Sequence, residues 1–468
     1  MADLETDVVV VGAGPAGENV ADCVVRAGLT CVVVEDHLAG GECSYYACIP
    51  SKALLRPMDL VGEVSRVPGL ELGPVDVAAV LARRDEANSH LDDSGQAEWI
   101  TKLPATLLRG RGGLTGEREV TVTAADGTVT VVRARHAVAL ATGSVPIVPP
   151  IEGLAEAKPW FSRDATTVRE VPARLVVLGG GVVACEMAQA LHALGANETT
   201  LLVRGDQLLG RVEPFAGKLL ADSFRESGID VRFDTEAQRV ERGPDGTVTV
   251  HLSDGSKVEA DELLVATGRR PATDGLGLDV AGLGGKGPVE VDDSMRVPGN
   301  EWLYAVGDLN GRSLLTHMGK YQARVCGDVI AARAKGEADD RPALRDTADG
   351  YGVPQVVFTD PQVAAVGRTE AAARDEGFDV RVVEYDLANV SGAYLLGDGY
   401  KGRAKAVVDE RRKVLLGVTF AGPGVAELVH AATIAVTAEV PLDKLWHAVP
   451  SFPTVSEIWL RLLEEYGL

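Results

Sequence analysis

Two cysteines stand close together in a chain that otherwise uses cysteine sparingly. Cys43 and Cys48 lie five residues apart in the stretch GGECSYYACIPSK, residues 40–52. Thiols at such a spacing can form a structural disulfide, half of a metal site or a redox pair. A zinc site is disfavoured because no second Cys/His pair follows at ligand spacing. The pattern favours a redox pair, with a metal site and inert core thiols as the alternatives, and we predict no bound metal.

The cysteine pair lies at the start of a predicted helix, CSYYACIPSKALL. Side chains five apart on an ideal helix are rotated by roughly 140° from each other. A disulfide between them therefore needs a distorted turn, which Pro50 can help to impose. Thiols at a helix N-terminus have a lowered pKa and react as thiolates. The other four cysteines sit in apolar contexts and are predicted to be buried: Cys23, Cys31, Cys185 and Cys326.

Length and charge limit the classes of protein to which the chain can belong. Its 468 residues allow two to four domains. It has 46 Lys and Arg against 68 Asp and Glu, a formal net charge of −22, which disfavours nucleic acid and anionic membranes as partners. The acidic start MADLETDVVVVGAG lacks the features of a signal peptide. We therefore expect a cytoplasmic protein with no membrane or nucleic-acid partner, in which a structural disulfide would be unusual.

The N-terminal stretch DVVVVGAGPAGENVADCVVRAGLTCVVVED predicts a strand, a turn, a helix and a second strand. Gly12, Gly14 and Gly17 form the pattern G-x-G-x-x-G at the first turn. They allow, in order, the tight turn, the approach of a pyrophosphate and the packing of helix on strand. The helix N-terminus then faces the phosphates. Glu35 closes the second strand, where a carboxylate can accept from ribose hydroxyls. Together these features predict a dinucleotide site.

A second stretch, ARLVVLGGGVVACEMAQALHALGANETTLLVRGD, repeats the pattern. Gly179, Gly181 and Ala184 give the permitted variant G-x-G-x-x-A. The second strand is followed by Arg204, not by an acid, and Arg211 comes seven residues later. Cationic side chains here suit a 2′-phosphate, so NADP is favoured, with NAD as the other possibility.

The repeat extends beyond the two glycine-rich turns. Asp-Gly hairpin turns occur at 126–127 and at 254–255, and each leads to a strand that ends in Ala-Thr-Gly, at 141–143 and at 266–268. Two nucleotide-binding domains side by side suggest two nucleotides in electronic contact. The natural pair is a nicotinamide and a flavin.

These motifs together resemble those of the class I pyridine nucleotide–disulfide oxidoreductases, the family of dihydrolipoyl dehydrogenase, glutathione reductase and mercuric reductase. The resemblance covers nearly the whole chain, in order: VGAGPAG, GGECSYYACIPSK, GGGVVACE, ATGRRP, YAVGD, VVFTDPQVAAVGRTE and SFPTVSE. It implies an α/β fold with two Rossmann-like domains and a C-terminal α+β dimerisation domain. The expected boundaries are 1–150 with 276–345 for the FAD domain, 151–275 for the NAD(P)H domain and 346–468 for the C-terminal domain of a homodimer.

The resemblance also implies residue roles. Cys43 becomes the interchange thiol that meets the substrate, and Cys48 the charge-transfer thiol under the flavin. Lys52 and Glu186 are expected to pair near the flavin N5, and Asp308 to bind the ribityl chain. The motifs and the resemblance together predict these further contacts: Gly12, Gly14, Ala16, Gly17, Glu35, Gly112, Thr142, Gly143 and His317 for FAD, and Gly179, Gly181, Arg204, Arg211 and Gly268 for NAD(P).

One departure from the family pattern bears on the acceptor. Disulfide reductases of this family carry a C-terminal His-Pro-Thr-x-x-Glu, whose histidine, supplied by the partner subunit, is the acid–base catalyst. Here Glu457 is present, but Phe452 takes the place of the histidine and cannot carry a proton. His447 lies five residues upstream, and register alone does not place it in the site. Tyr45 and Tyr46 also depart from the family, either to shape the acceptor face or simply to pack.

The sequence thus predicts an FAD-dependent NAD(P)H oxidoreductase that passes electrons through the Cys43–Cys48 disulfide to a small-molecule acceptor, namely a small disulfide, a quinone or a metal ion. General acid–base help typically gives 10²–10⁴-fold, so its absence argues against fast exchange with lipoamide or glutathione disulfide. One alternative is a dihydrolipoyl dehydrogenase with a relocated acid–base group. Another is a non-catalytic flavin and thiol redox sensor.

Overall fold

The computed structural model describes residues 2–468 of the chain. It divides into two compact units. The first contains the N-terminal residues up to Pro50 with 85–147 and 269–349, and the second contains 51–84 with 148–268 and 350–468. The α/β fold expected from the sequence is confirmed, while the residue boundaries of the three predicted domains stay a prediction.

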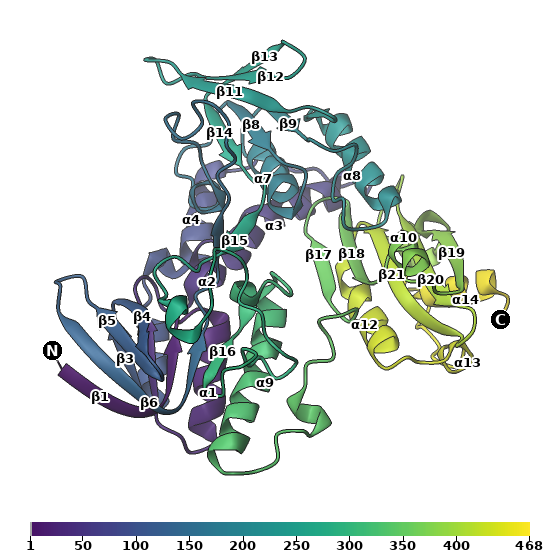
Figure 1. Cartoon of the computed structure of the whole chain (residues 1–468). Helices are drawn as coiled ribbons and strands as arrows, with labels where there is room; N and C mark the ends of the chain where they lie inside the picture. Colours follow the sequence, from purple (N-terminus) through teal and green to yellow (C-terminus); the bar gives the residue numbers. More distant parts are fainter. Residues whose placement is uncertain (1) are drawn as a thin grey trace. The chain divides into compact units, whose positions relative to one another are not determined.

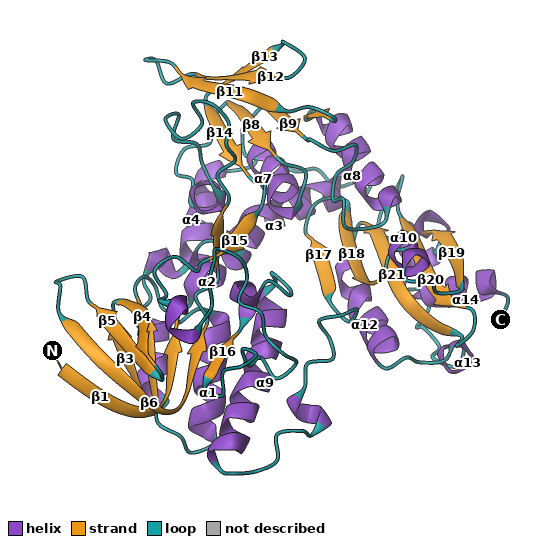
Figure 2. Ribbon diagram, in the orientation of Figure 1, coloured by secondary structure: helices purple, strands orange, loops and turns teal. Residues whose placement is uncertain are grey.

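The first unit is built around a seven-stranded sheet in the order β3-β2-β1-β6-β5-β4, with β16 paired to β6 (Figures 1 and 2). Strands β1, β2, β3, β6 and β16 run parallel, and β4–β6 form an antiparallel meander. The apolar run of β1 is buried on both faces, because alternate side chains belong to two different core clusters. The strands are β1 (Ala2–Val11), β2 (Cys31–Glu35), β3 (Ala105–Arg109), β4 (Arg111–Gly116), β5 (Glu119–Thr123), β6 (Val129–Leu140) and β16 (Leu303–Ala305).

Helices α1 and α9 cover one face of this sheet, and their buried residues share a core cluster with β1 and β6. A separate two-stranded ladder, β7 with β15, runs antiparallel. The helices and short strands of this unit are α1 (Pro15–Arg26), α2 (Gly41–Tyr45), α5 (Ser94–Lys102), α9 (Thr316–Ala334), β7 (Ser144–Pro146), β15 (Arg269–Pro271) and the 3₁₀ turns η1 (Ser89–Leu91), η2 (Leu278–Ala281), η3 (Gly307–Asn310) and η4 (Pro342–Leu344).

The second unit holds a four-stranded parallel sheet in the order β10-β9-β8-β14 and a three-stranded antiparallel sheet, β11-β12-β13 (Figure 2). Helix α3 begins in the first unit and continues into the second. The elements are α3 (Cys48–Ser65), α4 (Val77–Ala87), α6 (Ser162–Thr166), β8 (Arg174–Leu178), α7 (Val182–Ala193), β9 (Glu198–Leu202), α8 (Pro214–Ser227), β10 (Asp230–Arg232), β11 (Ala237–Arg242), β12 (Val248–Leu252), β13 (Lys257–Ala260) and β14 (Glu262–Val265).

The C-terminal part of the second unit is a five-stranded antiparallel sheet in the order β17-β18-β21-β20-β19. Its core lies between this sheet and α12 and α14. The elements are β17 (Pro354–Val357), β18 (Gln362–Gly367), α10 (Glu370–Asp375), β19 (Val380–Asp386), η5 (Leu387–Asn389), α11 (Ser391–Tyr394), β20 (Arg403–Asp409), β21 (Val414–Gly422), η6 (Ala426–Leu428), α12 (Val429–Thr437), α13 (Leu442–Leu445), η7 (Val455–Glu457) and α14 (Ile458–Tyr466).

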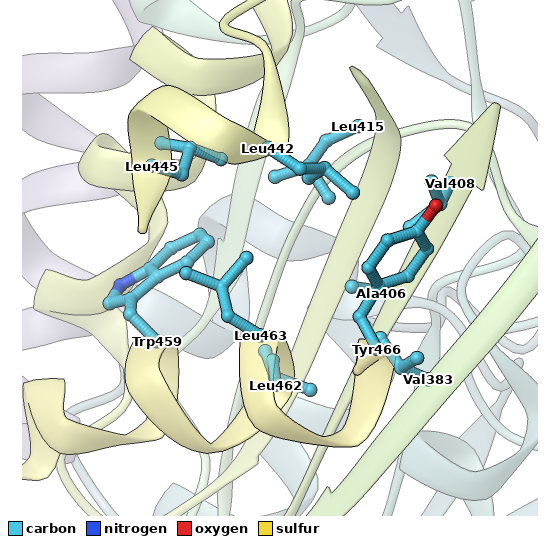
Figure 3. A pocket seen from close by; sticks show the side chains of 10 residues that line it. All are labelled: Val383, Ala406, Val408, Leu415, Leu442, Leu445, Trp459, Leu462, Leu463 and Tyr466. Carbon is cyan, nitrogen blue, oxygen red and sulfur yellow. The ribbon is translucent and has the colours of Figure 1, made fainter. Parts of the chain in front are cut away.

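A small pocket lies between α13, α14 and the strands of the C-terminal sheet (Figure 3). Its lining is almost entirely apolar, and the hydroxyl of Tyr466 donates to Glu410 at 3.0 Å. Such a lining offers no group that could reduce an acceptor, so the pocket is not a candidate active site. Across residues 2–468, the structure contains no helix with the length and apolar character that a membrane crossing requires.

Candidate functional site

The first glycine-rich turn has the geometry that a dinucleotide needs. Gly12 has φ +105°, and a Cβ there would lie 2.4 Å from the carbonyl oxygen of Ala141. A Cβ at Gly17 would lie 1.9 Å from the carbonyl oxygen of Gly12, so the turn and the start of α1 both require glycine. Gly14 differs, because its nearest obstacle would be 3.9 Å away. This open side, at the N-terminus of α1, fits the approach of a pyrophosphate.

Glu35 lies at the end of β2 and accepts two backbone hydrogen bonds. Its Oε2 accepts from Ala13 N at 2.7 Å, and its Oε1 accepts from His37 N at 2.8 Å. Burial raises the pKa of this carboxyl group, and the two backbone N–H groups oppose that effect. Gly112, on β4, packs against the Val34 side chain of β2, and a Cβ there would lie a tight 3.0 Å from Val34. The predicted ribose and adenine contacts therefore lie around one end of the sheet.

The second glycine-rich turn repeats the first in detail. Gly179 has φ +130°, and a Cβ there would lie 2.4 Å from the carbonyl oxygen of Ala266, the counterpart of Ala141. Gly181 precedes α7 and has nothing within 4 Å of an added Cβ. The internal repeat inferred from the sequence is thus present at atomic detail, and the turn fits a second dinucleotide.

Arg204 and Arg211 flank the loop after β9. Both side chains are exposed. Within residues 2–468, neither guanidinium makes an ion pair or a hydrogen bond with another side chain or with the backbone. By contrast, Arg232 on the adjacent β10 pairs with Asp230 at 2.7 Å. The two arginines are therefore available to an anionic ligand, as expected for a 2′-phosphate.

The structure shows two helices around the cysteine pair, so the prediction of a single helix was wrong. Helix α2 ends at Tyr45, Tyr46 has φ −131° and ψ −9°, and α3 begins at Cys48. Because of this break, the two cysteine side chains are not held roughly 140° apart as they would be on one helix. The thiols of Cys43 and Cys48 hydrogen-bond to each other. Thr316, the first residue of α9, places its Oγ1 3.3 Å from Cys48 Sγ. The distorted turn foreseen from the spacing is therefore a complete helix break.

The expected lowering of thiol pKa does not hold for Cys43 in this dithiol form. The hydrogen bond to Cys48 and burial both raise the pKa of Cys43, while Thr316 and Lys320 act in the opposite direction. The other cysteines, Cys23, Cys31, Cys185 and Cys326, are buried, as predicted. Burial also raises the pKa of each of these thiols, which makes them poor nucleophiles.

Lys52 and Glu186 form the expected ion pair within the second unit. Lys52 Nζ lies 2.7 Å from Glu186 Oε2, and the Glu186 side chain is buried. The other carboxylate oxygen accepts from Phe358 N at 3.0 Å, and Lys52 Nζ lies 4.9 Å above the Phe358 ring. Phe358 was not predicted, although it belongs to the quoted stretch VVFTDPQ. It directly follows β17 and fixes the pair from a segment far away in the sequence.

Asp308 lies in η3 of the first unit and is held by Ser144, whose hydroxyl donates to Asp308 Oδ2 at 2.6 Å. Burial raises the pKa of Asp308, and the Ser144 hydrogen bond opposes this. His317 follows in the first turn of α9 and is exposed. Sequence reasoning missed Ser144, although it directly follows the first Ala-Thr-Gly.

The fully buried Gln322 of α9 also holds the η3 turn through hydrogen bonds. Its Oε1 accepts from Gly307 N at 2.8 Å and from Asn310 Nδ2 at 2.9 Å. Its Nε2 donates to Asp349 Oδ2 at 2.8 Å. Asp349 lies beside Asp346, and burial together with this second carboxylate raises the pKa of Asp349 to about 7.

Phe452 is exposed in the chain, with 74% of its surface accessible. Glu457, its expected partner in the motif, is 5% exposed and bonds to Arg461 through Oε1. Its Oε2 is buried and has no hydrogen-bond partner within the described residues. His447 is exposed. Glu457 is thus a buried carboxylate with one oxygen unpartnered within the described residues, and the assignment of Phe452 and Glu457 to the acid–base motif stays a prediction.

The two tyrosines between the cysteines pack against the protein. Tyr45 is 4% exposed, and its backbone oxygen accepts from Asn88 Nδ2. The ring of Tyr46 lies 5.9 Å from the ring of His37. Packing accounts for Tyr45, whereas Tyr46 is half-buried and its role at the acceptor face stays a prediction.

Two family models together match most of the chain. Residues 6–331 match the family described as pyridine nucleotide-disulphide oxidoreductase, and residues 353–462 match the dimerisation domain of the same family. The chain is 31% identical to dihydrolipoyl dehydrogenase from Chlamydia muridarum over 97% of this chain and 95% of that protein. It is 30% identical to mercuric reductase from Staphylococcus aureus over 97% and 81%. The flavoprotein disulfide reductase RclA from Escherichia coli has a similar fold, with a TM-score of 0.85 at 24% identity, over 98% of this chain and 99% of RclA.

Proposed function

Because the chain belongs to the pyridine nucleotide-disulphide oxidoreductase family, we propose that it carries two electrons from NADPH through FAD to the Cys43–Cys48 disulfide and on to a small-molecule acceptor. The family consists of pyridine nucleotide-dependent flavoproteins, so FAD is the cofactor. The observation that carries the proposal is the meeting of Cys43 and Cys48 across a helix break. The four buried cysteines could not take this role.

The preference for NADPH rests on Arg204 and Arg211, whose charges are not neutralised by the surrounding protein. A 2′-phosphate would make charge-assisted hydrogen bonds with either guanidinium. The open turn at Gly181 accepts the pyrophosphate of the same nucleotide. NADH lacks the phosphate and would gain nothing from the arginines.

FAD, when bound, accepts a hydride and delivers two electrons to the disulfide. The S–S bond between Cys43 and Cys48 would break on taking up these two electrons, and with the proton of the hydride and one proton from solvent the two sulfurs would become free thiols. With FAD bound, Cys48 would be the thiol next to the flavin and Cys43 the thiol that meets the acceptor, and Thr316 would donate to the Cys48 sulfur when it is a thiolate. Lys52 and Glu186 would supply a fixed charge pair for the hydride transfer. Asp308 would hold the ribityl chain, and Glu35 the ribose of the adenosine.

The acceptor is limited by proton chemistry. A disulfide acceptor releases a thiolate that must take up a proton, and Phe452 cannot supply one. Quinones and metal ions need less help of this kind. We therefore place a quinone, a metal ion or a disulfide with an acidic leaving thiol ahead of lipoamide and glutathione disulfide. A dihydrolipoyl dehydrogenase activity is the second candidate, favoured by the relatives of that name and by the unpartnered Oε2 of Glu457.

We also propose a cytoplasmic homodimer. Large apolar side chains are exposed on the C-terminal segment, which matches the family's dimerisation domain, and a second copy would cover them: Tyr394, Leu395, Ile434, Val449 and Phe452. The close thiol pair and the low cysteine content fit a reducing compartment.

The test is a steady-state screen of the purified enzyme. The protein should be yellow, with about one FAD per chain as the family implies, and should oxidise NADPH with quinones or metal ions faster than with lipoamide or glutathione disulfide. The Cys43→Ser variant separates the routes, because a thiol-dependent acceptor loses turnover and an acceptor that takes electrons directly from flavin does not. A folded protein that takes up no FAD would contradict the proposal.

A further inference from the structure

Two residues at equivalent positions of the internal repeat touch each other in the first unit. Ser144 directly follows the first Ala-Thr-Gly, and Arg269 directly follows the second. They begin β7 and β15, which pair antiparallel. Arg269 Nε donates to Ser144 Oγ at 2.8 Å, and Arg269 Nη2 donates to the backbone oxygen of Ser144 at 2.6 Å. The guanidinium thus holds both the side chain and the backbone of one serine.

The two hydrogen bonds from Arg269 determine the direction in which the Ser144 hydroxyl donates. Because Arg269 Nε donates to Ser144 Oγ, the single hydroxyl proton is left to be donated to Asp308 Oδ2 at 2.6 Å. Asp308 therefore receives a hydrogen bond as an acceptor, which favours its charged form against the cost of burial. Ser144 is 7% exposed, so water competes little with this arrangement.

The same guanidinium faces a second carboxylate. Arg269 Nη2 lies 3.9 Å from Glu42 Oε2, and both side chains are largely buried, with 23% and 28% exposed. Glu42 lies in α2 and directly precedes Cys43. The Arg269 guanidinium therefore interacts directly with Glu42, which precedes Cys43, and through Ser144 with Asp308, the carboxylate proposed to bind the ribityl chain.

We propose that Arg269 is a positioning residue for the flavin and the redox thiols, which orients Asp308 through Ser144 and offsets the charge of Glu42 beside Cys43. The proposal rests on the flavin contact proposed for Asp308, and it does not depend on the acceptor or on the choice between NADPH and NADH. Reduction adds negative charge to bound flavin, so a nearby cation favours the reduced form and a nearby anion disfavours it. Arg269 and Glu42 should therefore act on the flavin in opposite directions.

The test compares Arg269→Gln, Arg269→Lys, Glu42→Gln and Ser144→Ala with the control Arg270→Gln. Arg270 is the next residue of β15, but its guanidinium donates to Asp274 at 2.6 Å, whereas Ser144 is bonded by Arg269. Three quantities are measured without NADPH or acceptor: the dissociation constant of FAD from apoprotein, the flavin midpoint potential against a reference dye, and the long-wavelength absorbance after two-electron chemical reduction.

We expect Arg269→Gln to lower the midpoint potential and Glu42→Gln to raise it. Arg269→Gln and Ser144→Ala should weaken FAD binding by roughly 10- to 100-fold, the scale of one charge-assisted hydrogen bond. Arg269→Lys keeps the charge, so it should restore most of the potential but not the FAD affinity. Arg270→Gln should match the unmutated protein in all three quantities.

Two results would overturn the proposal. One is a potential and FAD affinity of Arg269→Gln that equal those of Arg270→Gln. The other is a shift of the same sign in Arg269→Gln and Glu42→Gln, which would indicate a shared structural disturbance. If Arg269→Gln does not fold, the other variants decide: Arg269→Lys and Ser144→Ala should bind FAD more weakly and Glu42→Gln should have a raised potential, and the absence of both effects overturns the proposal. Asp308→Asn is measured in parallel, because unchanged FAD affinity in that variant would refute the ribityl contact itself.

Discussion

Lys52 Nζ lies 2.7 Å from Glu186 Oε2, and the same carboxylate accepts a backbone hydrogen bond from Phe358. The carboxylate is therefore held on both sides and keeps the ammonium in one place. Such a fixed charge pair suits a site where charge changes during hydride transfer.

We predict that Lys52→Met slows flavin reduction by NADPH by roughly 10- to 100-fold, as expected for one lost charge-assisted contact. Stopped-flow absorbance of the flavin measures the rate. The matched control is Lys405→Met, which removes a buried lysine paired with Glu213 and Glu370 at 2.7 Å each in the same unit. The control should lower the melting temperature and leave the reduction rate unchanged. Equal slowing in both variants would reject the role of Lys52.

The thiol assignment predicts different spectra for the two serine variants. Cys43→Ser leaves the Cys48 thiol beside Thr316 and should show a long-wavelength thiolate–flavin band in the oxidised enzyme. Cys48→Ser should abolish that band. Thr316→Val should weaken it, because the hydroxyl at 3.3 Å can no longer donate to the sulfur, and Thr316→Ser should restore it. A band that survives Cys48→Ser would show that the assignment of the two thiols is wrong.

Cofactor choice can be tested at the two arginines. Arg204→Glu or Arg211→Glu should raise the free energy of NADPH binding by ~1.5–3 kcal/mol, which is the scale of one charge-assisted contact, and should leave NADH nearly unaffected. The measurement is kcat/KM for both nucleotides. Arg232→Gln is the control, because Arg232 is already paired with Asp230. Equal or better use of NADH by the unmutated enzyme would refute the preference for NADPH.

The neighbouring carboxyl groups of Asp346 and Asp349 predict that the stability of the folded protein depends on pH. The pKa of Asp349 is raised to about 7, because it is buried beside Asp346. A raised pKa means that the folded protein holds this proton more tightly than the unfolded chain does. Its stabilising contribution is therefore complete below the ordinary pKa of an aspartate and is lost as pH rises through 7.

Asp349→Asn should remove this part of the pH dependence. One pKa unit corresponds to about 1.4 kcal/mol, so the free energy of unfolding that Asp349 contributes should fall by up to a few kcal/mol between roughly pH 4 and pH 7. Urea unfolding at a series of pH values measures it. Asp293→Asn is the control, because Arg312 lies 3.1 Å from the exposed Asp293 and 3.8 Å from Asp349. An unchanged pH profile in Asp349→Asn would contradict the assignment.

Phe452 offers a gain-of-function test. Phe452→His should raise kcat/KM for lipoamide and glutathione disulfide, by at most the 10²–10⁴-fold of a general acid–base. Glu457 is the expected orienter of the new imidazole, and its Oε2 has no partner within the described residues while Oε1 bonds to Arg461. Phe452→Leu, which carries no proton, should show no such gain. Lipoamide turnover of hundreds per second by the unmutated enzyme would reject the idea, since His447 or another group would then supply the proton.

The sequence predicted the repeated elements well, because glycine-rich turns and buried parallel strands leave strong local patterns. Gly12 and Gly179 have matching environments in the structure. The break between Cys43 and Cys48 was harder to predict, since Ser44, Tyr45 and Tyr46 have intermediate helix propensities that indicate neither continuation nor a stop. A local disulfide requirement pointed to distortion but not to its place.

Contacts that join distant segments were missed for a different reason. Nothing in the neighbourhood of Ser144 shows that its hydroxyl meets Asp308, and nothing near Phe358 shows that its N–H meets Glu186. The internal repeat held one usable signal, because Ser144 and Arg269 occupy the same place after Ala-Thr-Gly. Two residues at equivalent positions of a repeat are candidates for contact across its pseudo-symmetry.

The helix break after Tyr45 also bears on how new acceptors can evolve. Because α2 ends at Tyr45 and α3 begins at Cys48, Tyr46 and Ala47 form a connection that belongs to neither helix. Substitutions at Tyr46 and Ala47 can then change the surroundings of Cys43 without rotating Cys48 away from Thr316. The acceptor could then change while Cys48, the thiol proposed to receive electrons from the flavin, keeps its place beside Thr316. Randomised libraries of this connection should therefore yield altered acceptor ranges with the spectrum of the bound flavin preserved.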